Sequence, residues 1–147
     1  MRLTLLLPLL VSVSVSVSDF RQALSLYENG MYERARTMFE ELPDSPLSDG
    51  YVVLCALKMR TADNQELLSD YTKKYPSSTL SHPIAFENAG RLFDAGKYKE
   101  ALAVLSSVDL KALPKNSSAE YHFKLGYCNY VEGLFPEALK HNGRETP

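Results

Sequence analysis

The side chains of this sequence that could act in catalysis or metal binding do not occur at the spacings that such chemistry requires. His82, His122 and His141 form no set with cysteines or carboxylates at metal-ligand spacing, so each is expected to be a packed or solvated histidine. The sequence has no glycine-rich phosphate loop, no Gly-x-Ser-x-Gly elbow and no paired-carboxylate motif. We therefore predict a protein that is not an enzyme and uses no cofactor or metal.

The composition indicates a globular chain that does not bind nucleic acid. Of the 147 residues, 45% are hydrophobic and 23% are charged, and the formal net charge is -2. The 16 Lys and Arg residues are dispersed among 18 Asp and Glu residues, so no basic stripe could neutralise several phosphates at once. The pair Lys73 and Lys74 is too small for that purpose. A chain of this length is expected to form one domain.

The first 18 residues have the order of an export signal. Arg2 supplies a positive charge, an apolar stretch follows, and Ser16 and Ser18 place small residues at positions -3 and -1 of a cleavage site before Asp19. We predict a cleavable signal peptide over residues 1–18. The alternative, a membrane anchor, is disfavoured because the apolar stretch is short and is interrupted by Pro8 and several serines. A strand, suggested by the Val-Ser alternation, is the third possibility.

From Asp19 onward the sequence has helical periodicity and repeats one short motif three times. The motif is Gly-x-aromatic-x-x-Ala, with an apolar helical segment before and after it. Its alanines, Ala35, Ala101 and Ala138, are separated by 66 and then 37 residues, close to two units and one unit of about 34 residues. We predict a helical hairpin at each motif and one further hairpin between the first two.

Each position of the motif has a physical role in a helical hairpin. The glycines Gly30, Gly96 and Gly133 end the first helix, where the chain needs a left-handed backbone. The alanine lies where the two helices cross most closely, so a small side chain lets their backbones approach. The aromatic residue fills the corner between the helices. These aromatic residues are Tyr32, Tyr98 and Phe135.

The motif, together with Leu125-Gly126 in the last unit, resembles the tetratricopeptide repeat family. The resemblance covers residues 19–141 and implies an all-α fold, an α-solenoid of about three and a half antiparallel hairpins. In the last unit His122 stands at the family's tryptophan position. The Tyr75-Pro76-Ser77-Ser78 link between helices resembles exported bacterial members of the family.

The second hairpin is degenerate and the last is incomplete. Residues 51–57 and 65–71 are predicted as helices of the second hairpin, although the motif glycine and alanine are missing there. After residues 139–141 the repeat pattern stops, and residues 142–147 form a non-matching tail. Because each solenoid unit buries a face on the next, we expect a fragment or a truncated or frameshifted array, with further repeats of the same chain as possible neighbours. An interface shared with a partner is the alternative.

The family resemblance implies that the first helices of the hairpins line a concave groove. Aromatic side chains there would offer contact area at little conformational cost to an extended or helical peptide. The alternative for each ring is packing between neighbouring repeats. The predicted peptide-binding residues are Phe20, Tyr27, Phe86, Phe93, Phe123, Tyr127 and Tyr130.

The two cysteines are predicted to be buried thiols. Cys55 and Cys128 fall on the first helices of different hairpins, with another hairpin between them. Such a distance exceeds the Cα separation that a disulfide tolerates. A bridge would require the fold to bring the two helices together.

Two functional hypotheses follow from the predicted fold and the N-terminal segment. The first is an exported scaffold or adaptor, periplasmic, in the outer envelope or secreted, that binds a protein or peptide and has no stable membrane span after signal cleavage. The second is the sensing or targeting arm of a longer protein whose catalytic or signalling domain lies beyond residue 147. The lysine and asparagines with which some family members hold a chaperone's carboxylate tail are replaced here by Phe, Leu, Gly and Tyr.

Overall fold

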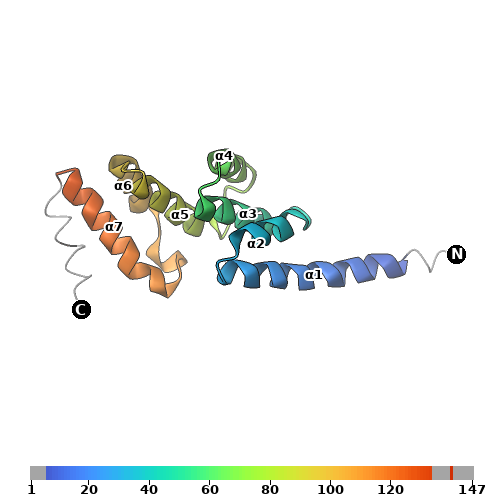
Figure 1. Cartoon of the computed structure of the whole chain (residues 1–147). Coiled ribbons are helices and arrows are strands. Elements are labelled where there is room, and N and C mark those ends of the chain that lie inside the picture. Colours follow the sequence, from blue (N-terminus) through green and yellow to red (C-terminus); the bar gives the residue numbers. More distant parts are fainter. Residues whose placement is uncertain (1–5, 134–139, 141–147) are drawn as a thin grey trace. The chain divides into compact units, whose positions relative to one another are not determined.

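The described part of the chain is all-α, as the sequence predicts. The computed structural model describes residues 6–133 and residue 140, with side chains described from Val17 onward (Figure 1). These residues form seven α-helices, two short 3₁₀ turns at Leu110–Ala112 and Lys115–Ser117, and no strand. The calls on Phe135, Ala138, the second helix of the last hairpin and the 142–147 tail lie outside the described residues.

The helices pack in sequential pairs within two compact units, residues 1–75 (unit 1) and 76–147 (unit 2). In unit 1, α1 packs on α2, α2 on α3 and α3 on α4; in unit 2, α5 packs on α6 and α6 on α7. The division falls within the predicted link at Tyr75-Pro76. The helices of unit 1 are α1 (Leu6–Glu28), α2 (Tyr32–Glu40), α3 (Pro46–Met59) and α4 (Asn64–Lys74). Those of unit 2 are α5 (Ser81–Asp94), α6 (Tyr98–Ser107) and α7 (Ser118–Val131).

The motif glycines end the first helices in the left-handed conformation, as predicted. The φ angles of Gly30, Gly96 and Gly133 are 76°, 73° and 78°. In the first hairpin the Met31 N–H donates to the Leu26 carbonyl over 2.9 Å, which closes the last turn of α1. The equivalent bond in unit 2 joins residues 97 and 92 at the same distance.

The degenerate second hairpin uses the same helix ending without the glycine. Arg60 has φ of 56°, and the Thr61 N–H donates to the Ala56 carbonyl over 3.1 Å. Arg60 therefore stands at the glycine position, where a side chain costs about 1–2 kcal/mol. The following helix begins at Asn64, four residues after Arg60, whereas α2 and α6 begin two residues after their glycines. This longer turn explains why the motif cannot be recognised here.

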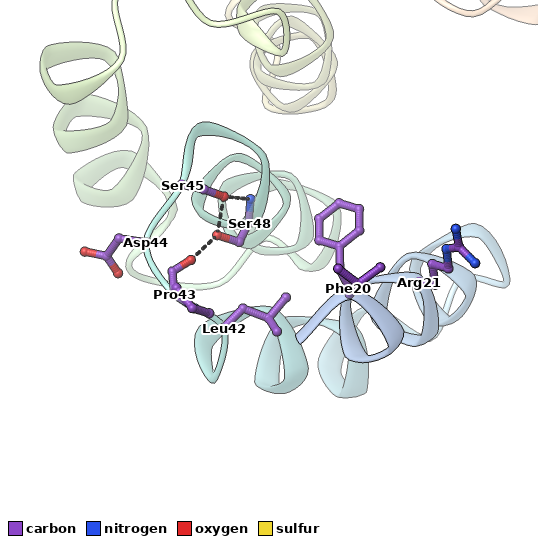
Figure 2. Close-up of a pocket in the computed structure, with 8 residues that line it drawn as sticks. Phe20, Arg21, Leu42, Pro43, Asp44, Ser45 and Ser48 are labelled. Atoms are coloured by element: carbon purple, nitrogen blue, oxygen red, sulfur yellow. Dashed lines mark hydrogen bonds between the residues drawn. The ribbon is translucent and has the colours of Figure 1, made fainter. Parts of the chain in front are cut away.

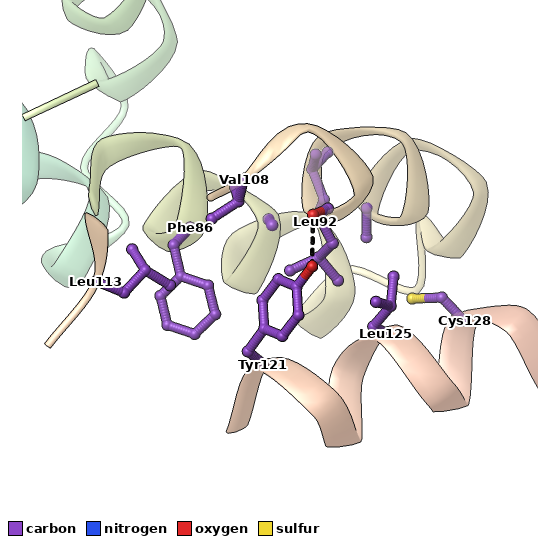
Figure 3. Close-up of a cluster of buried hydrophobic side chains, with 10 residues drawn as sticks. Phe86, Leu92, Val108, Leu113, Tyr121, Leu125 and Cys128 are labelled. Atoms are coloured by element: carbon purple, nitrogen blue, oxygen red, sulfur yellow. Dashed lines mark hydrogen bonds between the residues drawn. The ribbon is translucent and has the colours of Figure 1, made fainter. Parts of the chain in front are cut away.

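Each unit has its own hydrophobic core, built around a motif alanine. Ala35 in unit 1 and Ala101 in unit 2 are fully buried, as expected of small side chains between two helices. In unit 2, the side chains of Tyr121, Leu125 and Cys128 on α7 point toward α5 and α6 (Figure 3). The Tyr121 hydroxyl donates to the Leu105 carbonyl over 3.3 Å. Helix α7 is therefore an integral part of the core of unit 2.

The two cysteines are buried thiols, and neither forms a disulfide. Cys55 lies in the core of unit 1 and Cys128 in the core of unit 2, each with no exposed surface. Burial raises the pKa of the Cys55 thiol to about 12 and that of the Cys128 thiol to about 11. Both thiols are thus held in the protonated, unreactive form at neutral pH.

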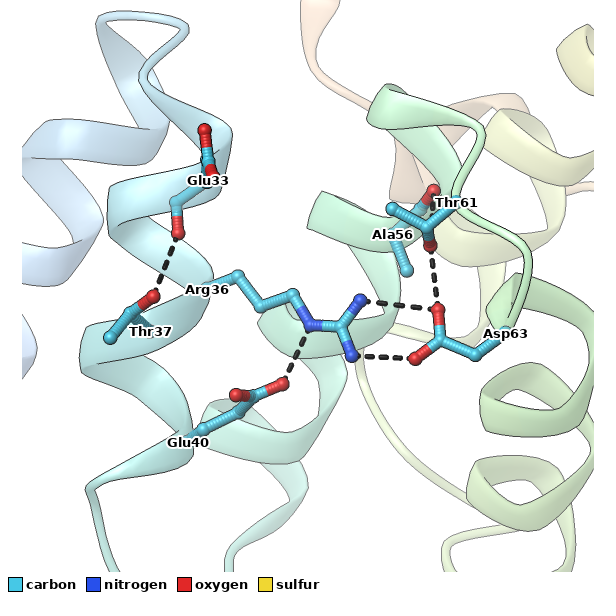
Figure 4. A network of polar contacts seen from close by, with 7 residues as sticks. All are labelled: Glu33, Arg36, Thr37, Glu40, Ala56, Thr61 and Asp63. Atoms are coloured by element: carbon cyan, nitrogen blue, oxygen red, sulfur yellow. Dashed lines mark hydrogen bonds and ion pairs between the residues drawn. The ribbon is translucent and has the colours of Figure 1, made fainter.

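An ion-pair network joins α2 to the turn between α3 and α4 (Figure 4). The Arg36 guanidinium donates to both carboxylate oxygens of Asp63, over 2.6 and 3.2 Å, and to Glu40 over 2.6 Å. The Thr61 hydroxyl donates to Asp63 over 2.7 Å. The two-pronged Arg–carboxylate geometry fixes the orientation of the longer turn relative to α2.

Helix α1 is continuous from Leu6 to Glu28 and therefore runs through the predicted cleavage site between Ser18 and Asp19. The signal peptide over residues 1–18 stays a prediction. Among the helices of the described residues, none is both long enough and apolar enough to cross a membrane.

Candidate functional site

The seven predicted binding residues are divided between the two units and differ in exposure. Phe20 and Tyr27 of α1 are half-buried in unit 1, and the other five lie in unit 2. Phe86 is 7% exposed and belongs to the core. Phe93 is half-buried, whereas Phe123, Tyr127 and Tyr130 are 46%, 38% and 58% exposed. The exposed members all lie on α7.

In unit 2, four rings from three helices form one continuous aromatic cluster, here called the aromatic face: Phe93, Tyr98, Phe123 and Tyr127. The Phe93 ring contacts each of the other three, at centroid distances of 5.3 Å to Tyr98, 6.1 Å to Phe123 and 5.4 Å to Tyr127. Tyr127 also contacts Tyr98 at 5.3 Å, edge to face. Phe93 is thus the centre of a cluster whose outer members reach the surface.

A lysine forms one border of the aromatic face. The Lys124 ammonium lies 5.8 Å from the Phe93 ring centre and 5.9 Å from that of Phe86, and it pairs with Glu120 one turn earlier on α7. Gly90 gives the lysine room, since a Cβ atom there would lie 3.1 Å from the Lys124 Nζ atom and would displace it by a few tenths of an ångström. The cation thus lies against two rings of α5 and is paired within α7.

The corresponding rings of unit 1 are used in packing. Tyr27 and Tyr32 form an edge-to-face pair at 5.4 Å, equivalent to Phe93 and Tyr98 in unit 2. Tyr27 and Phe20 both contact Tyr51 of α3, at 5.1 and 6.2 Å, and Tyr51 stacks on the buried Phe39. These rings pack around Tyr51 and are partly covered by it. The aromatic rings of unit 1 are therefore less exposed than the exposed rings on α7 of unit 2.

Two members of this site escaped the sequence analysis. Tyr98 was assigned only to the corner between helices, although its ring also meets Tyr127 of the next helix. A hydrogen bond with the Tyr127 side chain is the main cause that raises the pKa of the Tyr98 phenol. Lys124 carries no motif signal. The spacing of Phe86, Gly90 and Phe93 along one helix face was the available clue to its position.

Comparison with known proteins identifies the first hairpin. The family described as tetratricopeptide repeat matches residues 18–46, which cover the end of α1, all of α2 and the link to α3. Residues 18–46 form a tetratricopeptide repeat. No curated protein and no solved structure matches the chain. The α5–α6 hairpin has the same glycine turn, aromatic pair and buried alanine as this tetratricopeptide repeat.

A tetratricopeptide repeat is in general a protein-interaction scaffold and is typically not catalytic. No group of three or more His, Cys, Asp or Glu side chains within the described residues is arranged to hold a metal. The His82 Nδ1 atom accepts a hydrogen bond from the Asp109 N–H over 3.1 Å. His122 is buried, with its ring 5.2 Å from that of Tyr121. His82 therefore accepts a backbone hydrogen bond, and His122 is packed against an aromatic ring.

A hollow of about 330 Å³ lies at the outer side of the tetratricopeptide repeat, between α1 and the α2–α3 link (Figure 2). Its serines bond within the protein. The Ser45 Oγ accepts from the Ser48 N–H over 3.0 Å, and the Ser48 hydroxyl donates to the Pro43 carbonyl over 2.9 Å. These bonds cap α3 and provide no activated nucleophile, so the hollow has no catalytic arrangement.

Proposed function

We propose that this protein is an exported scaffold that binds a protein or peptide through the aromatic face of unit 2. The observation that carries the proposal is the run of exposed rings on α7. Phe123, Tyr127 and Tyr130 recur at four- and three-residue spacing, so they lie along one side of the helix. The first two join the ring cluster around Phe93.

The chemistry of the aromatic face suits a partner with apolar or aromatic side chains. Scattered exposed hydrophobic side chains are normal on a protein surface, whereas a contiguous group marks an interaction site. Rings that are already packed against one another lose little conformational freedom when a ligand covers them. The buried side of α7, with Tyr121, Leu125 and Cys128, anchors the helix in the core. The exposed rings are therefore presented on a rigid support.

Selection of peptides from a random phage-displayed library tests the proposal. We expect the wild-type protein to enrich sequences with apolar or aromatic anchors. The double substitution Phe123→Ala and Tyr127→Ala should weaken binding of the enriched peptides about tenfold or more, as for hot-spot aromatic residues. Fluorescence anisotropy measures the affinities, and circular dichroism checks that the helices remain.

The matched control removes exposed apolar side chains from unit 1. Met31 and Leu47 are 41% and 45% exposed, close to the values for Phe123 and Tyr127. Met31→Ala with Leu47→Ala should leave the affinity unchanged. Equal weakening in both double variants, or a loss of helical signal in the α7 variant alone, contradicts binding at the aromatic face.

Export is the second part of the proposal. It is supported by the order of residues 1–18, with Arg2, an apolar stretch and the small residues Ser16 and Ser18. Cleavage after Ser18 would begin the chain at Asp19. The tetratricopeptide repeat would then keep the residues of α1 that contribute to its core, Phe20, Ala23 and Tyr27.

A further inference from the structure

The first helices of the three motif hairpins each carry two aromatic side chains at the same places relative to the motif glycine. These places lie ten and three residues before the glycine, so the two rings are about two helical turns apart on one side of the helix. The same surface is thus built three times in this chain. The pairs are Phe20 and Tyr27 in α1, Phe86 and Phe93 in α5, and Phe123 and Tyr130 in α7.

In unit 1, a tyrosine of the helix that follows the hairpin contacts both rings of the pair. The Tyr51 ring of α3 lies 6.2 Å from the Phe20 ring and 5.1 Å from the Tyr27 ring, measured between ring centres. Both contacts are edge to face. One helix with one tyrosine is therefore sufficient to contact the two rings together.

In unit 2, the helix that follows the hairpin contacts the pair with two tyrosines. The Tyr121 ring of α7 lies 6.4 Å from the Phe86 ring, and the Tyr127 ring lies 5.4 Å from the Phe93 ring. Phe86 is only 7% exposed beneath this helix. In both units the chain thus covers this surface with a helix that carries tyrosine.

On α7 the same pair of rings is exposed. Phe123 and Tyr130 are 46% and 58% exposed. Tyr127 lies between them along the helix, is 38% exposed, and has its ring centre 6.2 Å from that of Phe123. Because Tyr127 also contacts Phe93, the exposed rings are continuous with the interface through which α7 covers α5.

The lysine beside the exposed rings is already paired. The Lys124 ammonium pairs with Glu120, and the Lys124 side chain is 14% exposed. The surface that remains at the three exposed rings is therefore aromatic, and Val131, 44% exposed, extends it. The complementary partner surface is the apolar or aromatic side of a helix.

We propose that the partner docks on the aromatic face as an α-helix and places an aromatic side chain, tyrosine or phenylalanine, between Phe123 and Tyr130. This ligand class rests on the proposed function, because it assumes that the aromatic face binds a partner. The docked helix contacts the rings of α7 as α3 contacts those of α1 and as α7 contacts those of α5. The ring pair thereby selects a helical ligand over an extended one.

Three synthetic peptides test this proposal on the full chain. The first is an alanine-based helix of about 15 residues, held helical by side-chain lactam bridges, with a central tyrosine and a leucine one turn to each side. The second has alanine in place of the tyrosine. The third keeps the tyrosine and the leucines but has no bridges and contains two interior prolines, which prevent helix formation.

We expect the tyrosine helix to bind and to shift the backbone amide signals of Phe123, Tyr127 and Tyr130 in heteronuclear NMR spectra. The alanine helix should bind about fivefold more weakly, and the proline peptide about tenfold more weakly. Fluorescence anisotropy measures the three affinities.

Tyr130→Ala tests the outer ring of the pair and should weaken binding of the tyrosine helix about fivefold. The side chain of Tyr130 is mostly exposed, so its removal leaves the core of unit 2 in place, and circular dichroism checks this. Met31→Ala, at a 41% exposed apolar side chain of unit 1, is the matched control and should leave the affinity unchanged.

The proposal is overturned if the tyrosine helix does not bind, if it binds no better than the alanine helix or the proline peptide, or if Tyr130→Ala has no effect. When peptides selected from the phage library bind the aromatic face in any of these cases, the helical ligand class is excluded and the proposed function stands. When Phe123→Ala with Tyr127→Ala weakens neither the selected peptides nor the tyrosine helix, the proposed function fails as well.

Discussion

At the residue scale, Arg36 and Asp63 form a two-pronged ion pair. Hydrogen bonds from Arg36 and then from the Thr61 hydroxyl lower the pKa of the Asp63 carboxyl from an ordinary 3.8 to about 2. The Asp63 side chain is 41% exposed, so solvent screens the pair and its contribution is limited to about 1 kcal/mol. Its main effect is to orient the turn at the end of α3.

This pair predicts a pH-dependent difference between the wild type and Asp63→Asn. Because the pKa of Asp63 is lower in the folded than in the unfolded chain, the stabilisation is complete above about pH 4. It is lost as the pH falls through about 2. Urea unfolding should show the variant less stable by about 0.5–1 kcal/mol at pH 7, with the difference shrinking below pH 4. Glu100→Gln, at an exposed site, is the control and should show no such trend.

At the element scale, the three hairpins differ in how their first helices end. Gly30 and Gly96 adopt the left-handed conformation without strain, because they have no Cβ atom. Arg60 adopts the same conformation against the steric cost of its Cβ atom. The second helix then starts later after Arg60 than after the glycines. The two turns with a glycine are therefore shorter than the one with Arg60 and are free of its backbone strain.

The glycine turn predicts that Gly96→Ala destabilises the protein through its backbone alone. A Cβ atom on Gly96 would meet no atom within 4 Å, so packing does not contribute to the loss. We expect a decrease of about 1 kcal/mol in the free energy of unfolding, measured with urea. Gly96→Asn should lose less, since asparagine tolerates the left-handed region better. Unchanged stability in Gly96→Ala would show that the turn adjusts its φ angle.

At the scale of the whole molecule, the chain consists of two units that each complete a hydrophobic core. The α1–α2 hairpin of unit 1 and the α5–α6 hairpin of unit 2 have the same construction, yet they present different surfaces. In unit 1, Tyr51 of the following helix covers the rings of α1. In unit 2, the corresponding helix α7 adds exposed rings of its own.

Export predicts a defined processing event in the whole chain. Expressed in a host with a general secretion pathway, the protein should yield a mature form that begins at Asp19, as measured by intact mass. Ser18→Leu should block processing, because the -1 position requires a small residue. Ser14→Leu leaves positions -3 and -1 intact and should be processed normally. A wild-type product that retains residues 1–18 would rule out cleavage at this site.

Local sequence was sufficient for the hairpins because their turns depend on short-range chemistry. Gly30 and Gly96 meet a backbone requirement that few other residues satisfy, and the alanines five residues later meet a steric one. The same reasoning could not detect the second hairpin's ending, because Arg60 takes the left-handed conformation at a cost that no motif records. The buried thiols of Cys55 and Cys128 followed from their places on apolar helices.

The amino-acid sequence by itself determined the all-α class, the helix pairs and the burial of both cysteines. Only the tertiary structure decided which of the aromatic side chains reach the surface. Phe86 and Phe123 are both phenylalanines on first helices, yet one is 7% and the other 46% exposed. The exposure of each ring depends on which helix packs against it. The Lys124 ammonium likewise lies near the Phe86 ring of another helix, and the Lys74 ammonium pairs with Asp44, 30 residues earlier in the chain. Such contacts have no signature in local spacing, because they arise only when separate helices come together.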